Sequence, residues 1–218
     1  MKIRFVLTAI FSLTISGSAF AQSFEIFDVA FGSAPVNGSN ILVAALGLPE
    51  FDSNLGTLQG VTLTLTSTFN GSIFVYNNPP GPPVFQTVKA SLYAAAFDSG
   101  AFPPPVFSFP SASVSGTVET GGSTFPISVT SSQSGSPTTI GSYEAAGGGS
   151  RTIDVYGGVE NVTSSSLTSG PGPFSCFGDL KVDYTYAAIP EPATYATVLG
   201  VAALGLAAIR RKRQVACP

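Results

Sequence analysis

Histidine and tryptophan are absent from this 218-residue chain. Without histidine the chain cannot form the Ser-His-Asp or Cys-His arrangements of common hydrolases, and it lacks a frequent ligand of protein-bound zinc. Cysteine is scarce as well, because Cys176 and Cys217 are its two thiols and they lie on opposite sides of an apolar run. We therefore expect no intrachain disulfide, no metal site and no cofactor.

Charged residues are also few. They make up 10% of the chain, against about 25% in a typical soluble domain, so polarity comes from serine, threonine, asparagine and glycine. Between Gln22 and Ile189, three residues are basic and eleven are acidic. A nucleic-acid-binding surface needs the opposite balance, so we expect no binding to nucleic acid. Hydrophobic residues reach 44% of the chain, which is enough to form a core.

The first 21 residues have the three parts of a secretory signal peptide. Lys2 and Arg4 form a positive start, residues 5–15 are mostly apolar, and Ala19 and Ala21 make an A-x-A cleavage site. We expect signal peptidase to cleave directly after this site. The mature protein is then exported.

A second patterned segment lies near the C-terminus. Pro190-Glu191-Pro192 is followed by the uncharged run 193–209 and by four basic residues, Arg210, Arg211, Lys212 and Arg213. As a helix the run would measure about 25 Å, slightly less than the ~30 Å hydrocarbon core of a bilayer. We expect one transmembrane helix that begins after the prolines. The basic cluster would stop transfer and keep the C-terminus in the cytoplasm.

This order of features resembles the PEP-CTERM sorting tail of Gram-negative bacteria. The resemblance rests on Pro190-Glu191-Pro192, the apolar run and the basic cluster, all behind a signal peptide. It implies that an exosortase, a membrane-embedded enzyme, recognises the motif and cleaves near it. Residues 189–213 would then be the sorting signal and 214–218 a short cytoplasmic tail. A plain C-terminal anchor is the alternative.

Residues 22–188 show the pattern of many short strands. The clearest is 61–69, where valine, leucine and phenylalanine alternate with threonine and serine, as in a half-buried strand. Asn70-Gly71 suits a type I′ turn, so we expect a hairpin with a second strand at 72–76. In that hairpin, Phe74 and Tyr76 would join the leucine face.

Further expected strands are separated by segments rich in glycine and proline. Residues 89–97 are alanine-rich and suit a helix equally well. The pattern predicts an all-β fold, with one antiparallel β-sandwich or barrel-like domain over 22–188. The further strands are expected at 24–31, 41–46, 84–97, 111–119, 124–130, 138–143, 152–162 and 174–187.

Two stretches of this domain resemble the choice-of-anchor E domain. One is Phe51-Asp52 with Leu55-Gly56-Thr57-Leu58 and the Thr/Leu strand after it, and the other is the final strand that carries Val182, Tyr184 and Tyr186. The resemblance implies a secreted β domain whose relatives carry different surface anchors. It assigns no activity.

Several side chains remain candidates for ligand chemistry. Asp52 and Asn54 have the spacing of two calcium ligands, and Cys176 suits a buried strand thiol. The threonine row of the strand at 61–69 is either a hydroxyl array for polysaccharide or a plain solvent face. Four acids could in principle supply the carboxylate pair of glycoside hydrolysis, although solvated loop acids are more common. They are Glu50, Asp52, Asp154 and Glu160.

The resemblance to PEP-CTERM proteins implies a structural or adhesive role linked to exopolysaccharide or biofilm, and the absence of catalytic groups favours a protein that is not an enzyme. A carbohydrate- or calcium-binding module is the alternative, and a glycoside-active enzyme comes third. The expected partners are signal peptidase, an exosortase, the inner membrane before processing, and exopolysaccharide. The mature domain is expected at the cell envelope, cell surface or extracellular matrix.

Overall fold

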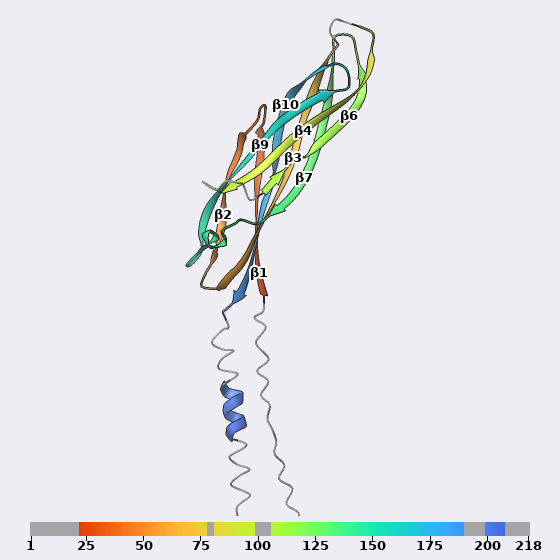
Figure 1. The fold of residues 1–218 in the computed structure, drawn as a ribbon. Coiled ribbons are helices and arrows are strands. Elements are labelled where there is room, and N and C mark those ends of the chain that lie inside the picture. The colour runs from red at the N-terminus through yellow and green to blue at the C-terminus, as the bar shows by residue number, and fades with distance from the viewer. Residues whose placement is uncertain (1–21, 78–80, 99–105, 190–198, 208–218) are drawn as a thin grey trace, which may run out of the picture.

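The computed structural model describes residues 22–77, 81–98, 106–189 and 199–207. Most of these residues form strands, which lie in two sheets packed face to face as a β-sandwich (Figure 1). The predicted all-β fold is confirmed. Ala19 and Ala21, the Pro190-Glu191-Pro192 motif and the basic cluster 210–213 lie outside the described residues.

The strands follow one another with a single short helix among them. This is a 3-10 helix, η1 (Ile140–Tyr143), which precedes β8. In chain order the strands are β1 (Gln22–Pro35), β2 (Ile41–Asp52), β3 (Gly56–Tyr76), β4 (Val84–Asp98), β5 (Val106–Ser108), β6 (Ser111–Val118), β7 (Ser123–Gly135), β8 (Glu144–Ala145), β9 (Gly149–Ser164) and β10 (Thr168–Ala188).

The strand order is that of a jelly roll. The first sheet runs β1-β10-β3-β7, and the second runs β5-β4-β9-β2-β8, with β6 also paired to β4. All pairs are antiparallel except β2 with β8. When the eight long strands are numbered in chain order, the sheets read 1-8-3-6 and 2-7-4-5, the order of a jelly-roll sandwich.

Alternation along the strands builds the core between the sheets. On β3, Leu63 and Leu65 are fully buried while Thr64 and Thr66 face outward, as the sequence predicts. Phe51 and Tyr186, one from each of the two stretches that resemble the choice-of-anchor E domain, pack together with their ring centroids 4.8 Å apart.

The predicted hairpin at Asn70-Gly71 is wrong. β3 is one strand of 21 residues that pairs with β10 on one side and β7 on the other. Its alternation continues through the Asn-Gly pair, so Ile73 is buried, whereas Phe74 is 38% exposed and lies on the outer face. Tyr76 is exposed on that same face.

Gly71 serves close packing instead of a turn. It faces the core opposite Phe174, and a Cβ at this position would lie 2.3 Å from the phenylalanine ring. The missing side chain therefore leaves the space that Phe174 occupies. Asn70 stays in the strand, where its side-chain oxygen accepts a hydrogen bond from Ser128.

Two other expectations need correction. Residues 140–143 form η1 and not a strand, because the buried ring of Tyr143 and a bond from Arg151 to Ser142 hold a turn there. Residues 168–173, expected as a turn, belong to β10 and contain a break in its register with β3. The alanine-rich segment 89–97 is strand and not helix, and lies within β4.

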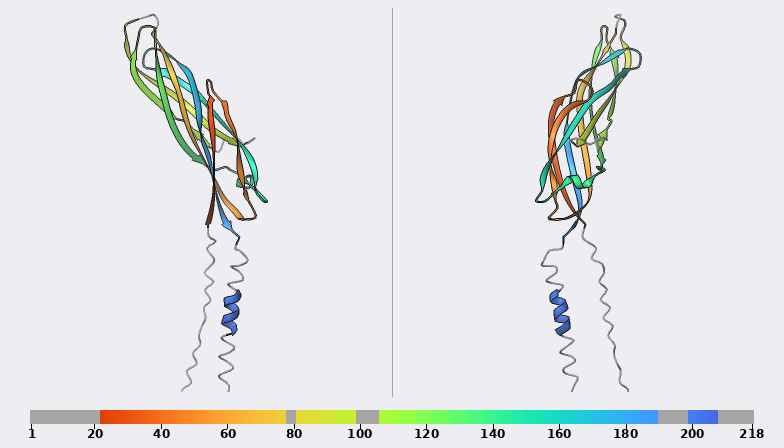
Figure 2. Two further views of the ribbon diagram at one scale, coloured as in Figure 1. Left: turned by 180° about the vertical axis from the view of Figure 1, so that it is seen from behind. Right: turned by 60° about the vertical axis from the view of Figure 1, so that its left-hand side comes forward.

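The first strand begins and the last strand ends at the same end of the elongated sandwich (Figures 1 and 2). Gln22, the first residue of β1, is in register with Ala187 of β10. Beyond the sandwich, residues 199–207 form a helix. Among the described residues, no helix has the length and apolar character to cross a membrane.

Candidate functional site

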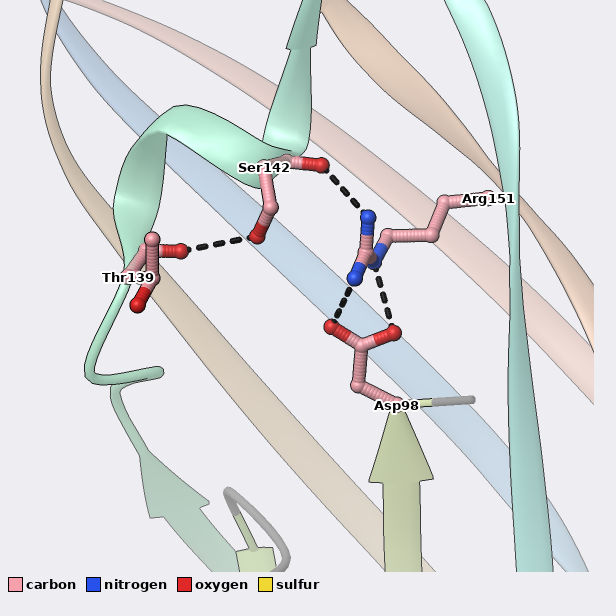
Figure 3. Close-up of polar contacts among 4 residues, drawn as sticks. All are labelled: Asp98, Thr139, Ser142 and Arg151. Carbon is pink, nitrogen blue, oxygen red and sulfur yellow. Dashed lines mark hydrogen bonds and ion pairs between the residues drawn. The ribbon is translucent and has the colours of Figure 1, made fainter. Parts of the chain in front are cut away.

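An ion pair between Arg151 and Asp98 lies at one end of the core, on the second sheet. Asp98 continues the inward column of β4 and is 5% exposed, and Arg151 lies on the neighbouring strand β9. The guanidinium of Arg151 donates hydrogen bonds to both carboxylate oxygens of Asp98, with Nε 2.7 Å from Oδ1 (Figure 3). Its third nitrogen donates to the carbonyl of Ser142 in η1, at 2.6 Å.

The ring of Tyr143 completes this cluster. The guanidinium carbon of Arg151 lies 4.9 Å from the ring centroid, a cation–π contact. Burial, reinforced by the charge of Asp98, raises the pKa of Tyr143 to about 12. Burial disfavours the charged form of Arg151, but the hydrogen bond and charge of Asp98 outweigh it and raise the pKa of the guanidinium. The cluster thus fixes η1 against the sheet and holds no activated nucleophile.

Asp52, the last residue of β2, connects two loops through hydrogen bonds. Its Oδ1 accepts the backbone N–H of Asn54 at 2.9 Å and that of Gly147 at 2.8 Å. These two hydrogen bonds, in that order, lower the pKa of the carboxyl. The Asp52–Asn54 spacing therefore forms an Asx turn. Within the described parts of the chain, no group of three or more acids and cysteines is placed to hold a metal ion.

The four candidate acids are spread along the sheet. Asp154 is in register with Ala45, five positions along β2 from Glu50, which corresponds to about 16 Å of strand. Glu160 lies six residues further along β9. A glycosidase pair needs about 5–9.5 Å between carboxyl groups, so the register keeps Asp154 and Glu160 away from Glu50 and Asp52.

Cys176 lies inside the sandwich. It is fully buried on β10, and burial raises the pKa of its thiol to about 12. A thiol that stays protonated at neutral pH is a poor nucleophile. The expected buried strand thiol is what the structure contains.

Hydroxyl groups line the outer face of the first sheet. The threonine row of β3, Thr62 included, faces outward, and side-chain hydrogen bonds join it to the edge strand β7. Cross-strand pairs of this kind stabilise a sheet, so the row has a structural role in addition to any ligand it meets. The bonded pairs are Thr64–Ser134 (2.7 Å), Thr66–Ser132 (3.2 Å), Thr68–Thr130 (2.8 Å) and Asn70–Ser128 (2.7 Å).

An aromatic cluster lies on the outer face of the second sheet. Phe107 and Phe109 are nearly parallel, with ring centroids 5.7 Å apart, and are 42% and 62% exposed. Phe97 contacts Phe107 at 6.2 Å and Tyr156 at 5.3 Å, both edge-to-face. Ala95 faces outward beneath them and is nevertheless fully buried. We call these four rings, Phe97, Phe107, Phe109 and Tyr156, the aromatic cluster.

The sequence did not reveal the aromatic cluster. Phe107 and Phe109 fall in the proline-rich segment that was expected to be a loop, and strand β5, which carries Phe107, has only three residues. Their spacing of two residues, which places both rings on one face of a strand, was the available signal. It becomes readable only once the register of β4 with β5 is known.

Comparisons with known proteins assign no family. No family model matches the chain, and no curated protein matches it. Two solved structures of infectious bursal disease virus, the Gx strain and the T=1 particles, match at TM-scores of 0.21 and 0.20 and at 4% and 7% identity. Each match covers 76% of this chain, but the chain spans only 37% and 36% of the viral chains. At such low TM-scores these likenesses carry no argument about fold or function.

Proposed function

We propose that this chain is an exported, non-catalytic surface protein with a structural or adhesive role in a bacterial cell envelope or exopolysaccharide matrix. A signal peptide directs it out of the cytoplasm, and its C-terminal tail holds the precursor in the inner membrane. An exosortase recognises Pro190-Glu191-Pro192 and cuts nearby. The sandwich is the part that reaches the cell envelope or matrix after both ends are processed.

The arrangement of the two chain ends supports this proposal. Because Gln22 and Ala187 are in register, β1 begins and β10 ends side by side. The signal peptide and the sorting tail therefore both connect to one end of the sandwich, and the rest of the elongated domain extends away from that end (Figure 2). A domain held at one end in this way presents its far end and both outer faces to the surroundings.

The chemistry of the described side chains agrees with a non-catalytic role. Each guanidinium nitrogen of Arg151 donates a hydrogen bond to Asp98 or Ser142, and Asp52 accepts hydrogen bonds from two backbone groups. Cys176 is buried and protonated. These groups hold the fold together, so a structural function accounts for their placement.

Cell fractionation with and without the exosortase tests the sorting proposal. In cells that have the enzyme, we expect the protein to leave the inner-membrane fraction and appear at the surface or in the medium. In cells that lack it, the precursor should stay in the inner membrane. Equal distribution in both strains would overturn exosortase sorting and leave a plain anchor.

The aromatic cluster favours binding of carbohydrate as a second candidate function. Exposed ring faces such as those of Phe107 and Phe109 attract the C–H faces of sugars, and aromatic side chains provide a large contact area at low entropic cost. Asp154, which is in register with Phe97, adds a carboxylate beside the rings that can accept hydrogen bonds from sugar hydroxyls. The hydroxyl row on the other sheet offers hydrogen bonds, and Phe74 and Tyr76 are exposed on β3 beyond the end of that row.

A glycan array with the mature exported protein tests this second candidate. We expect Phe109→Ala to abolish binding that the unchanged protein shows. Phe85→Ala is the matched control, since Phe85 is 68% exposed but lies outside the aromatic cluster. Binding that survives Phe109→Ala, or no binding at all, would exclude the aromatic cluster as a glycan site.

A further inference from the structure

Four large apolar side chains are exposed at the end of the sandwich where both chain ends leave. Phe24 and Ile26 are 64% and 56% exposed on the outer side of edge strand β1. Leu55 and Ile189 are 44% and 59% exposed, and they are neighbours because the N–H of Ile189 donates to the carbonyl of Leu55 at 3.1 Å. We call these four residues the base patch.

The apolar character stops a short distance up the sheet. The next outward residue of β1 is Asp28, in register with Lys181 of β10. Lys181 in turn pairs with Asp183 at 3.0 Å, and beyond β10 the outer face continues in threonine hydroxyls. The outer face of the first sheet is therefore apolar at its base and polar along its middle, and the rings of Phe74 and Tyr76 are exposed again at the far end of β3. Exposed phenylalanine and isoleucine cost free energy in water, so an apolar partner at the base would stabilise the protein.

Chain length limits how far the base patch can be from the tail. The apolar run begins at Ala193, four Cα steps after Ile189, and four steps span at most about 14 Å. The headgroup layer on each side of a bilayer is about 5–8 Å thick. Phe24 lies two positions above the Gln22–Ala187 row, or about 7 Å along the strand. If the run is in the membrane, this short connection brings the base patch within reach of the membrane surface.

We propose that, in the uncleaved precursor, the base patch rests on the outer surface of the lipid bilayer, with Phe24 at the boundary between headgroups and acyl chains. This inference depends on the proposed function, because it requires the tail to be in the membrane. The flanking charges are mainly acidic, and Lys181 is paired with Asp183. Apolar contact and not attraction to anionic lipid therefore drives the docking, and its strength is insensitive to salt.

The absence of tryptophan makes a direct test possible, because one introduced tryptophan is the sole indole in the chain. Full-length precursor is reconstituted in zwitterionic phosphatidylcholine vesicles with and without brominated acyl chains, which quench nearby indoles. Phe24→Trp and Ile26→Trp probe the base patch. Leu204→Trp, in the helix at 199–207, probes the tail. Phe85→Trp, exposed at the opposite end of the sandwich, is the control.

We expect bromolipid to quench most of the emission of Leu204→Trp and Phe24→Trp, to quench Ile26→Trp less, and to leave Phe85→Trp unchanged. All three replaced side chains of the sandwich are exposed, and an unchanged far-ultraviolet circular dichroism spectrum verifies folding. Quenching at Leu204→Trp without quenching at either base position would overturn the docking and leave the tether intact. A blue-shifted but unquenched Phe24→Trp would identify a second protein copy as the partner and would also overturn it. No quenching at Leu204→Trp would contradict both the tether and the docking.

Discussion

Of the three basic residues between Gln22 and Ile189, Arg151 is the most buried, and Lys89 is exposed. The side chain of Arg151 is 22% exposed and that of Asp98 is 6% exposed. An inward-facing charge is tolerated in a sandwich only when a partner and further hydrogen bonds satisfy it. Asp98, the carbonyl of Ser142 and the ring of Tyr143 supply these contacts. At this scale the ion pair of Arg151 and Asp98 stabilises the fold.

Removing the partner of Arg151 should destabilise the fold. We expect Asp98→Ala to lower the free energy of unfolding by about 2–3 kcal/mol, less than the ~3–5 kcal/mol for a fully buried pair, because part of the guanidinium reaches water. Urea denaturation measures the change. Lys89→Ala, at an exposed basic residue, should change stability by at most ~0.5 kcal/mol. Equal effects of the two substitutions would contradict a clamping role for the ion pair.

The Asp52 carboxylate should make a pH-dependent contribution to stability. Its folded-state pKa lies below the ordinary value of 3.8, so ionised Asp52 stabilises the fold above that value and this contribution is lost as the pH falls through the lowered pKa. We expect the unchanged protein to be more stable than Asp52→Asn near pH 7, and the difference to shrink as the pH falls below 3.8 and through the lowered pKa. Thermal unfolding of both proteins measures it. A difference that stays constant with pH would show that the charge is not what the two backbone N–H groups recognise.

At the scale of elements, β3 shows how a correct pattern can give a wrong connection. The alternation in 61–69 correctly predicts which side chains face the core, because burial of one face fixes a period of two. The Asn-Gly pair was misread because the same dipeptide suits a turn and a crowded strand. What decides between them is Phe174, more than 100 residues away in the sequence. No local pattern contains that contact.

Gly71 should therefore be intolerant of a side chain for reasons of packing. We expect Gly71→Ala to cost about 1–3 kcal/mol, because its Cβ would meet the Phe174 ring and the carbonyl of Pro173. Gly32→Ala in β1, where no atom lies within 4 Å of the new Cβ, should be neutral or slightly stabilising. Denaturant unfolding measures both changes.

A double-mutant cycle identifies the contact that causes the intolerance. Phe174→Ala removes the ring, so Gly71→Ala should cost clearly less in that background, with a coupling of about 1 kcal/mol or more. Additive costs would show that Gly71 is required for another reason, such as a backbone conformation that alanine resists.

The other elements also differ in whether the local sequence or a contact with a distant residue determines their structure. Strands β1, β4, β6, β7 and β9 were predictable because each carries its own alternation or strand-forming residues between clear turn signals. The 3-10 helix at 140–143 and the short strand β5 were not, since Arg151 of β9 holds the first and the edge of β4 pairs with the second. The same holds for the candidate site. The threonine row was predictable from the local sequence, whereas the aromatic cluster depends on the register of β4 with β5.

At the scale of the whole molecule, the sandwich has a base and a free end. Both chain ends and the base patch lie at one end, and the turns between β6 and β7 and between β9 and β10 lie at the other (Figure 1). The outer faces between them differ in chemistry, one lined with hydroxyl groups and the other carrying the aromatic cluster. A protein with this polarity suits attachment at one end and contact with its surroundings along both faces.

Intact mass spectrometry of the exported protein tests the central proposal most directly, because it locates both processed ends in one measurement. The proposal predicts a mature chain that begins at Gln22 and ends near Pro190-Glu191-Pro192, without the apolar run and the four basic residues. In cells without the exosortase, the same N-terminus should be found on a chain that continues to Pro218. A protein that keeps residues up to Pro218 in both strains would contradict the proposal.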